Sequence, residues 1–426
     1  MRLSKLFCAL AASLVLFACT DAKTKAPAVN APVVSAAGAN ATAAKCEYPT
    51  SPIDTSSFVA IHGNDESLPC RFGRRTLFTL DSASFDIDHK LANITRNSRG
   101  EYIVFGRGNV LGLLDASGKL IRTFGRDGSG PGEFRSATGL LVAANDTVYV
   151  IDGGQRRLTV IDPTFTKLIR TVSVPSLAGG ENVLPLPQSQ LLVGGQVFAG
   201  VQPDTSFNTL RIMSADGRIV RAWGIDTMSA NESARNRRKG IRELVGKRGA
   251  VMARRLSAGV DGSVMVARAN SYLVEQWSSD FHLTRTFARH VDWFPTLSVA
   301  GMRLNFVNDS TPAQIFGVAV DSASGNIVVQ LIVASSRWKS PADVRTAGEG
   351  KTSSVKLDGD LTKYLDTIFE SFDPRTGQLT ASIRLPGFFA SLSSGQQFWT
   401  RRELPDGDVA IDVVQLELSG HAKTSR

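Results

Sequence analysis

The sequence predicts an all-β protein folded as a six-bladed β-propeller of four-stranded antiparallel blades. Short apolar runs ended by turns recur from about Leu77 onward, no long helical periodicity interrupts them, and one strand–turn pattern repeats. Four antiparallel strands joined by hairpin turns make one propeller blade. A composition of 42% hydrophobic and 20% charged residues excludes a wholly disordered chain.

The clearest blade spans residues 126–172. After a glycine-rich connection at 128–134, strands are expected at 139–142, 148–152, 158–162 and 167–172. Weaker copies of this unit begin near Tyr102, Leu210, Gly262 and Gly325, and a last set runs from Phe388 to Leu416. Because a lone blade leaves one face uncovered, a strand near Leu77–Leu80 is expected to join the last blade and close the ring.

The length of the body agrees with this count of blades. Residues 77–418 divide into six repeats of about 57 residues, and three stretches look like insertions: 225–255, 289–315 and 335–360. Without them each repeat has about 43 residues, inside the range of known propeller repeats. The same arithmetic also allows a ring of seven blades.

The N-terminus carries an export signal. Arg2 and Lys5 precede an apolar run of 13 residues, Leu6–Ala18, which is shorter than the ~20 residues of a membrane-spanning helix. The run ends Leu16-Phe17-Ala18-Cys19, which resembles a bacterial lipobox. The resemblance implies that Cys19 carries lipid, including palmitate. An ordinary cleaved signal with an incidental cysteine is the alternative. By similarity to enterobacterial lipoproteins, Thr20 implies the periplasmic face of the outer membrane.

The segment after Cys19 is a tether. Residues 20–45 are rich in Ala and contain no long aliphatic or aromatic side chain, so they cannot bury enough apolar surface to fold. Cys46 and Cys70 then remain as a pair in an oxidising compartment. A disulfide between them would close a loop of about 25 residues and contribute roughly 3 kcal/mol. A catalytic dithiol is the less favoured alternative, because the spacing is not C-x-x-C.

These observations divide the chain into five parts. We expect a lipoprotein signal peptide at 1–18, a tether at 19–45, a lead-in with the disulfide at 46–76, the propeller at 77–418 and a C-terminal tail at 419–426.

One repeat has a recognisable signature. Segment 128–162 resembles an NHL-type repeat in its glycine-rich lead and in a set of residues within its strands: Phe134, Gly139, Val148, Tyr149, Val150, Asp152, Arg156 or Arg157, and Leu158 to Ile161. The resemblance implies a six-bladed propeller. The NHL family contains binding scaffolds and a few enzymes, so it implies no single function.

Two features of this repeat have competing interpretations. The glycine run 128–132 could be taken for a phosphate loop, but Pro131 removes a donor and β-strands follow, which favours a connection between blades. Asp152 with Arg156 and Arg157 could bind a ligand at the channel mouth. Turn chemistry is the favoured interpretation, with the carboxylate accepting backbone N–H groups.

No set of residues predicts a metal or another cofactor, and no catalytic residue is assigned. The histidines are scattered: His62, His89, His282, His290 and His421. The resemblance to NHL-like amidating lyases would imply channel histidines from several blades, whereas the candidates His282 and His290 both lie in one blade or its outgoing loop. Calcium-dependent lactonases of similar fold suggest four oxygen-bearing candidates whose spacing singles out none of them: Asn109, Asp152, Asn270 and Asp321.

The excess positive charge is concentrated in one predicted insertion. Residues 235–255 contain nine bases and one acid, Glu243, in a chain whose net charge is +9. The bases are Arg235, Arg237, Arg238, Lys239, Arg242, Lys247, Arg248, Arg254 and Arg255. Ser229 and Glu232 suggest a capping box for a short helix. A solvated loop and a surface that binds an anionic envelope component or an acidic protein are both open, while a periplasmic address argues against nucleic acid.

Together these features predict a cell-envelope lipoprotein. Its propeller would be a non-enzymatic binding or scaffold module, anchored to the membrane by lipid and engaging a protein or an anionic partner. The alternative is a metal-assisted, lactonase-like hydrolase with its site in the central channel.

Overall fold

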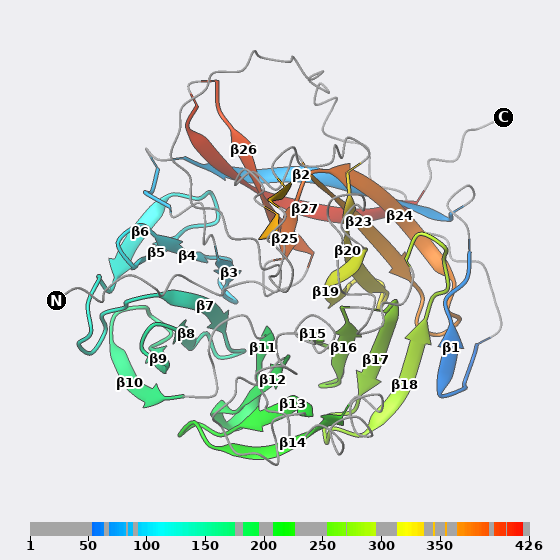
Figure 1. The fold of residues 1–426 in the computed structure, drawn as a ribbon, viewed down its shortest axis with the longest axis horizontal. Coiled ribbons are helices and arrows are strands. Elements are labelled where there is room, and N and C mark those ends of the chain that lie inside the picture. Colours follow the sequence, from blue (N-terminus) through cyan, green and yellow to red (C-terminus); the bar gives the residue numbers. More distant parts are fainter. Residues whose placement is uncertain are drawn as a thin grey trace.

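The computed structural model describes the protein over residues 53–63, 68–81, 84–87, 93–174, 182–195, 208–225, 254–269, 271–294, 313–335, 344–345, 354–355, 364–391, 396–405 and 407–420. These residues form a six-bladed β-propeller, whose six sheets stand around a common centre (Figure 1). The predicted fold class is therefore confirmed. The expected signal peptide, tether and helical insertion lie outside the described residues.

The first three blades follow one another along the chain. Blade 1 contains β3 (Ile94–Arg96), β4 (Tyr102–Gly106), β5 (Val110–Leu114) and β6 (Leu120–Phe124). Blade 2 contains β7 (Ala137–Val142), β8 (Val148–Asp152), β9 (Arg157–Ile161) and β10 (Leu168–Ser173). Blade 3 contains β11 (Asn182–Pro185), β12 (Leu191–Gly194), β13 (Asn208–Met213) and β14 (Ile219–Ile225), with a 3-10 turn at Pro187–Ser189.

The remaining blades include two additions to the basic unit. Blade 4 contains β15 (Arg254–Ala258), β16 (Val264–Arg268), β17 (Leu273–Trp277), β18 (Leu283–Ala288) and, as a fifth strand, β1 (Phe58–Ala60). Blade 5 contains β19 (Gln314–Val320), β20 (Ile327–Ala334), β23 (Leu365–Phe372) and β24 (Leu379–Pro386), and a two-stranded ribbon of β21 (Val344–Arg345) and β22 (Ser354–Val355) lies between β20 and β23 in the sequence. Blade 6 contains β25 (Phe389–Ser391), β26 (Gln397–Glu403), β27 (Val409–Gly420) and β2 (Cys70–Leu80).

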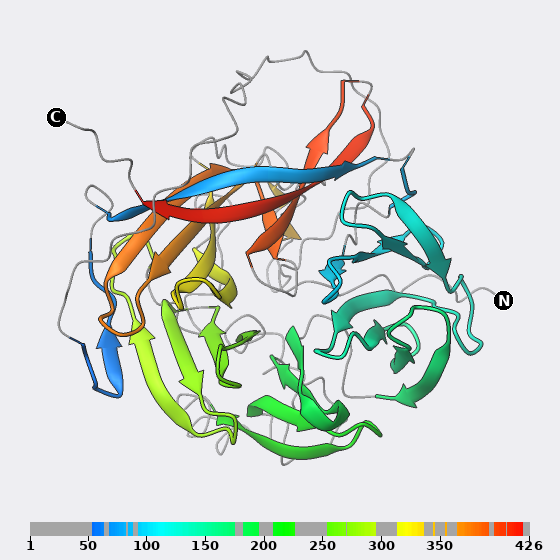
Figure 2. The same ribbon diagram turned by 180° about the vertical axis from the view of Figure 1, so that it is seen from behind.

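Blade 6 closes the ring by joining both ends of the propeller sequence. β2 runs antiparallel to β27 over its whole length, from the pair Cys70–Gly420 to the pair Leu80–Ile411. Seen from behind, β2 lies along β27 across the full width of the blade (Figure 2). This confirms the expectation that an N-terminal strand near Leu77–Leu80 completes the last blade, which removes the open edge.

A second N-terminal segment ties blades 4 and 5 together on the rim. β1 pairs with β18 in parallel. Beyond β1, the backbone of His62 donates to the carbonyl of Gly377 at 3.0 Å and accepts from the amide of Leu379 at 2.7 Å. The lead-in that precedes β2 is thus part of the packed ring.

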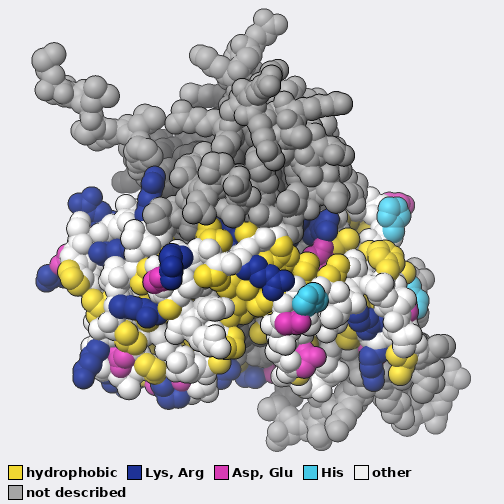
Figure 3. All heavy atoms as spheres, turned by 90° about the horizontal axis from the view of Figure 1, so that it is seen from below, with side chains coloured by type: hydrophobic (Ala, Val, Ile, Leu, Met, Phe, Trp, Pro, Cys, Tyr) yellow, Lys and Arg dark blue, Asp and Glu magenta, His cyan; other side chains and the backbone are white. Residues whose placement is uncertain are grey.

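The core is divided among the contacts between blades. Six clusters of buried apolar side chains fill the six interfaces between neighbouring sheets. β4 and β8 are buried at every position because both of their faces meet another blade. The outermost β6 is almost wholly exposed. Seen from the rim, apolar side chains are scattered among Lys and Arg rather than gathered into one surface (Figure 3).

Blades 4 and 5 also share a buried polar group. Arg289, just after β18, forms an ion pair with Glu370 of β23, and the hydroxyl of Tyr272 donates to the same carboxylate. Burial, together with the Glu370 carboxylate, raises the pKa of Tyr272 well above its usual range. The charges are matched inside an otherwise apolar interface.

The turn between the third and fourth strands is a repeated feature. In blade 1 the Asp115 carboxylate accepts from the amides of Ser117 at 2.8 Å and Lys119 at 3.0 Å, and Gly118 takes a left-handed φ of 86°. In blades 3 and 4, Asp216 and Asp280 likewise accept from a serine hydroxyl in the same turn. These serine hydroxyls lower the pKa of Asp115, Asp216 and Asp280. This turn is the Asp/Gly repeat visible in the sequence.

The two ends of the ring differ in what they carry. We call the end at which the first strand of each blade begins the connection face, and the opposite end the hairpin face. Because neighbouring strands are antiparallel, turns between second and third strands also lie at the connection face. The strand ends that flank 226–253, 295–312 and 336–363 therefore all lie at the connection face.

Candidate functional site

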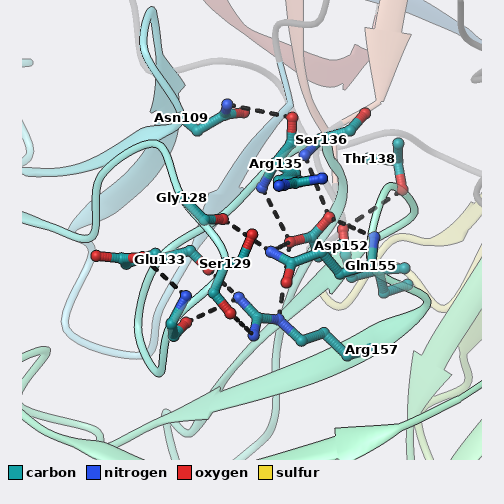
Figure 4. Close-up of polar contacts among 12 residues, drawn as sticks. Asn109, Gly128, Ser129, Glu133, Arg135, Ser136, Thr138, Asp152, Gln155 and Arg157 are labelled. Carbon is teal, nitrogen blue, oxygen red and sulfur yellow. Dashed lines mark hydrogen bonds and ion pairs between the residues drawn. The ribbon is translucent and has the colours of Figure 1, made fainter.

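The Asp152 constellation of blade 2 is a fully formed polar network (Figure 4). Asp152 ends β8 with no exposed surface. Its carboxylate accepts from the amides of Arg135 at 3.0 Å and Ser136 at 3.2 Å, and from the Nε2 of Gln155 at 2.9 Å. The amide of Gln155 also donates to it, at 3.2 Å. The carboxylate therefore organises the turn around it.

Arg157 connects this carboxylate to the glycine-rich loop. Its Nε lies 3.8 Å from Asp152 Oδ2, and its terminal nitrogens donate to the carbonyls of Ser129 and Gly130 at 3.0 Å each, and to that of Glu133. Its guanidinium faces the loop rather than solvent, since only 12% of the side chain is exposed. The geometry therefore supports a structural role, in which Asp152 stabilises the turn and Arg157 stabilises the glycine-rich loop.

Arg156 is oriented separately from Arg157. It has a left-handed φ of 51°, and its carbonyl accepts from the amide of Val174 at 2.8 Å. Its backbone therefore links the turn to the end of β10, while the neighbouring residue holds the loop.

The glycine run forms a closed connection between blades 1 and 2. The amide of Gly130 donates to Glu133 Oε2 at 2.7 Å, and Arg126 Nε donates to Glu133 Oε1 at 2.8 Å. The first of these bonds does most to lower the pKa of Glu133. Gly125 has a φ of 82°, and a Cβ there would lie 2.4 Å from the Phe134 ring. The loop amide that a phosphate could use is already bound by a side chain of this chain.

The oxygen-bearing candidates do not share one place. Asn109 lies in the turn between β4 and β5 at the connection face, where its Nδ2 donates to Asp127 Oδ1 at 2.8 Å. Asp321 lies in the turn between β19 and β20, at the hairpin face, and accepts from the amide of Ala323 at 3.2 Å. Asn270 lies outside the described residues. The structure thus separates Asp321 from Asn109 and Asp152.

The described histidines are also dispersed. His282 contacts Asp280 at 2.7 Å on an exposed turn of blade 4, whereas His62 bridges to blade 5 at the rim. His290 is exposed just beyond β18. Within the described ranges, no three His, Cys, Asp or Glu side chains gather in a way that could hold a metal ion. His89 and His421 lie outside those ranges.

The basic stretch is divided by the structure. Arg254 and Arg255 belong to β15 and are buried, with 3% and 8% of their surface exposed. Seven of the nine bases lie outside the described residues: Arg235, Arg237, Arg238, Lys239, Arg242, Lys247 and Arg248. The last two arginines of the stretch are thus in a propeller strand.

Arg255 lies at the inner edge of blade 4, at the connection face. Its guanidinium carbon stands 4.6 Å from the centre of the Phe316 ring, on the first strand of blade 5. Among the described residues, no carboxylate bonds to it, and its Nε is buried without a hydrogen-bond partner. Burial lowers the pKa of Arg255 to about 10. The side chain is a buried cation that rests on an aromatic ring.

Aromatic side chains of blades 5 and 6 continue from Arg255 of blade 4. Phe316 contacts Phe388 with a centroid separation of 5.2 Å, and Phe388 contacts Trp399 at 6.5 Å. Phe316, Phe388 and Trp399 are all partly exposed. They come from β19, from the residue before β25, and from β26. We call Arg255, Phe316, Phe388 and Trp399 the inner-edge cluster.

Local backbone features orient this cluster. Phe316 is the extra residue of a β-bulge, because Ile315 pairs with Leu331 and Gly317 pairs with Gln330. A bulge redirects a side chain that regular pairing would send to a face of the sheet. The strand that carries Arg255 is held by Asn182 of blade 3, whose Oδ1 accepts from the amide of Leu256 at 2.7 Å.

Phe388 is fixed by the backbone on both sides of it. Thr367 of blade 5 donates its hydroxyl to the carbonyl of Gly387 at 2.9 Å and accepts from the amide of Phe389 at 3.1 Å. Gln330 donates to the carbonyl of Phe389, and Thr400 donates to that of Phe388 at 2.9 Å. Thr367 and Gln330 are buried. Side chains of blades 5 and 6 thus fix the backbone that carries the Phe388 side chain.

Sequence reasoning named Arg255 but missed its aromatic neighbours. In the sequence Arg255 ends a stretch of nine bases, and Phe316 and Phe388 carry no motif. The available signal was position: both phenylalanines lie at the start of the first strand of a blade, the part of a propeller that reaches the centre of the connection face.

The described residues define the class of protein: a closed six-bladed β-propeller with an arginine and aromatic cluster at its inner edge. Two solved structures share this architecture. A member of the DUF4221 family from Bacteroides vulgatus has a TM-score of 0.52 at 6% identity, over 82% of this chain and 99% of that one. A presumed exported protein from Bacteroides fragilis has a TM-score of 0.52 at 10% identity, over 85% of this chain and 99% of that one.

At these identities the likeness shows the fold alone. No protein-family model matches the sequence, and no curated protein matches it. The NHL resemblance of segment 128–162 stays a prediction. In the part of the chain that the structure describes, no helix is long and apolar enough to cross a membrane.

Proposed function

We propose that this protein is a cell-envelope lipoprotein whose propeller is a non-enzymatic binding or scaffold module. The observation that carries the proposal is the asymmetry of the ring. The strand ends that flank its three longest connections, and the inner-edge cluster, all lie at the connection face. Loops on a rigid support are where binding residues concentrate, so the connection face is the proposed binding face.

The proposed address comes from the N-terminal sequence. A charged start, the apolar run Leu6–Ala18 and Cys19 support export and lipidation, and residues 20–45 would tether the propeller to the periplasmic face of the outer membrane. A disulfide between Cys46 and Cys70 suits the same compartment. The similarity in fold to a presumed exported protein agrees with this address.

The proposed partner is a protein or an anionic component of the envelope. The bases Arg235, Arg237, Arg238, Lys239, Arg242, Lys247 and Arg248 fall between β14 and β15, whose facing ends lie at the connection face. Clustered bases raise the local concentration of anionic partners. The hydrolase alternative is not part of this proposal, because Asp321 lies at the opposite face from Asn109 and Asp152.

The address is tested by labelling the full-length protein with an alkyne analogue of palmitate in a Gram-negative host. We expect the label to enter the wild-type protein, to be lost in Cys19→Ser, and to fractionate with outer membranes. Unlabelled wild-type protein, or labelled protein confined to the inner membrane, would contradict the anchor or its destination respectively.

The partner surface is tested with vesicles of phosphatidylglycerol and phosphatidylcholine. Changing Arg235, Arg237, Arg238 and Arg242 to Gln should weaken binding of the soluble body at least about tenfold at low salt, because each base near an anionic surface contributes about 1 kcal/mol. The matched control changes four exposed bases elsewhere: Arg71, Arg74, Lys119 and Arg122. Equal losses in both variants would mean that net charge, rather than this surface, drives binding.

A further inference from the structure

Arg255 differs from Arg268, another arginine at the same end of blade 4. Arg268, at the end of β16, forms two hydrogen bonds with Glu275 Oε1, at 3.0 and 2.6 Å, so its charge is matched within the blade. Arg255 is more deeply buried, yet within the described residues its charge meets only the face of Phe316. Burying a guanidinium without an anion is unfavourable, so an anion that reached Arg255 would bind to a charge already stripped of most of its water.

We propose that the inner-edge cluster is a binding site for a small organic carboxylate. The carboxylate would receive hydrogen bonds from the Arg255 guanidinium, and the apolar part of the molecule would lie against Phe316 and Phe388. The inference rests on the proposed function of the connection face as the binding face, and it adds the chemical class of one ligand.

The chemistry of the cluster favours a single negative charge attached to an apolar body. A guanidinium matches a carboxylate with two parallel hydrogen bonds. The next positions around the inner edge are rings rather than further bases, and they are partly exposed. A polyanion would leave its remaining charges against these rings, whereas an aryl or alkyl group would gain from covering them.

The cluster is also held in place before any ligand arrives. The strand of Arg255 is bonded to Asn182 of blade 3, the bulge of β19 sets the direction of Phe316, and Thr367 fixes the backbone on either side of Phe388. A site built on strands of a closed ring loses little freedom on binding. Three blades thus contribute one preformed surface.

The test measures the Kd of three probes for the full propeller body, residues 46–426, by isothermal titration calorimetry. Phenylacetate carries a carboxylate and an aryl group, phenylacetamide is its neutral analogue, and inorganic phosphate is an anion without an apolar part. We expect phenylacetate to bind with a Kd of about 1 mM or tighter. Phenylacetamide and phosphate should both bind at least about tenfold more weakly, a difference of about 1.4 kcal/mol.

The variants separate the two halves of the site. Arg255→Gln should weaken phenylacetate at least about tenfold, and Phe316→Leu about threefold while leaving phosphate unchanged. The matched control is Arg122→Gln, an exposed arginine on the outer strand β6, which should leave all three affinities unchanged. Since Arg255→Gln removes a buried charge, it should also raise Tm, by about 2 °C, so a loss of binding in this variant would not reflect unfolding.

Several results would overturn the proposal. Wild-type protein that binds none of the probes would reject the site. Phosphate binding as tightly as phenylacetate would reject the organic class, and equal losses in Arg255→Gln and Arg122→Gln would reject Arg255. If vesicle binding persists in any of these cases, only the carboxylate site fails and the proposed function stands. If phenylacetate binds but vesicles do not, the polyanion surface fails and the carboxylate site stands.

Discussion

Two arginines with little exposed surface, Arg157 in blade 2 and Arg255 in blade 4, have different roles in the same ring. Arg157 donates to three carbonyls of one loop and faces the Asp152 carboxylate. Arg255 rests on an aromatic ring and, in the described part of the chain, meets no carboxylate. Both start or nearly start a strand at the connection face.

The comparison separates structure from binding by counting partners. A charged group whose counter-charge and hydrogen-bond acceptors belong to its own chain stabilises the fold. A buried charge without an anion is a cost to the fold, and such costs concentrate at functional sites. The residues that resembled a family motif are the structural ones, and the candidate for binding carries no motif.

The largest expected effect comes from removing the carboxylate of blade 2. Asp152→Ala leaves several buried donors without an acceptor and Arg157 without its counter-charge, so the free energy of unfolding should fall by about 4 kcal/mol. Urea denaturation measures this. The control is Asp86→Ala, an exposed aspartate 3.5 Å from Arg107, which should change stability by less than about 1 kcal/mol. If Asp152→Ala lowered the free energy of unfolding by as little as Asp86→Ala does, the hydrogen bonds of Asp152 would not stabilise the fold.

The buried ion pair of blades 4 and 5 tests the cost of removing a buried carboxylate. Glu370→Gln keeps the shape of the side chain but removes the negative charge that pairs with Arg289, and should lower the free energy of unfolding by about 3 kcal/mol. Glu417→Gln is the comparison, because the Arg75–Glu417 pair is exposed by 61% and 53% and should contribute less than about 1 kcal/mol. A Glu370→Gln protein as stable as the wild type would show that this ring tolerates the loss of a buried negative charge beside an arginine, and would weaken the argument for Arg255.

The glycine-rich connection gives an effect of intermediate size. Gly125→Ala combines a left-handed φ of 82° with a clash against Phe134, and should lower the free energy of unfolding by about 2–3 kcal/mol. Gly108 has a φ of 74°, and a Cβ there would have nothing within 4 Å of it. Gly108→Ala therefore measures the cost of the left-handed backbone without a clash, about 1 kcal/mol of the free energy of unfolding. Equal effects would mean that the contact with Phe134 does not hold the loop.

The smallest effect per residue comes from the repeated turns, and it depends on pH. The turn serines lower the pKa of Asp115, Asp216 and Asp280. Their contribution is therefore complete above the unfolded pKa of about 3.9 and is lost as the pH falls further. The urea midpoint should fall as the pH is lowered below about 4, and less steeply when all three aspartates are changed to Asn. An unchanged slope in the triple variant would assign the acid sensitivity to other carboxylates.

The sequence predicted the middle and outer strands well, because apolar runs and Asp/Gly turns are local features. It did not mark the inner strand β3, which has only three residues. Val409–Gly420 is one uninterrupted strand, within which Asp412 accepts from Thr79 at 2.7 Å and from Arg402 at 2.9 Å instead of making a turn. Those partners lie on other strands.

The candidate site was harder to predict for the same reason. Arg255 is adjacent to a stretch of bases, and only the pairing of β15 with β16 shows that it is buried. The direction of Phe316 depends on a bulge defined by its pairing with β20. The contact between Phe316 and Phe388 joins residues of two blades. Each of these facts belongs to the assembled ring and has no local signature.

The closure of blade 6 also has a consequence for folding during synthesis. β2 is near the start of the propeller sequence, and its partner β27 ends at Gly420. A chain that has emerged only as far as residue 400 holds an N-terminal strand with no neighbour, while the intervening blades are already available to pack. The pairing of β2 with β27 has to wait for the end of the chain, and it joins segments far apart in the sequence, a slow kind of contact. A premature stop that removed only β27 would leave the ring open, although five of the six sheets would be intact.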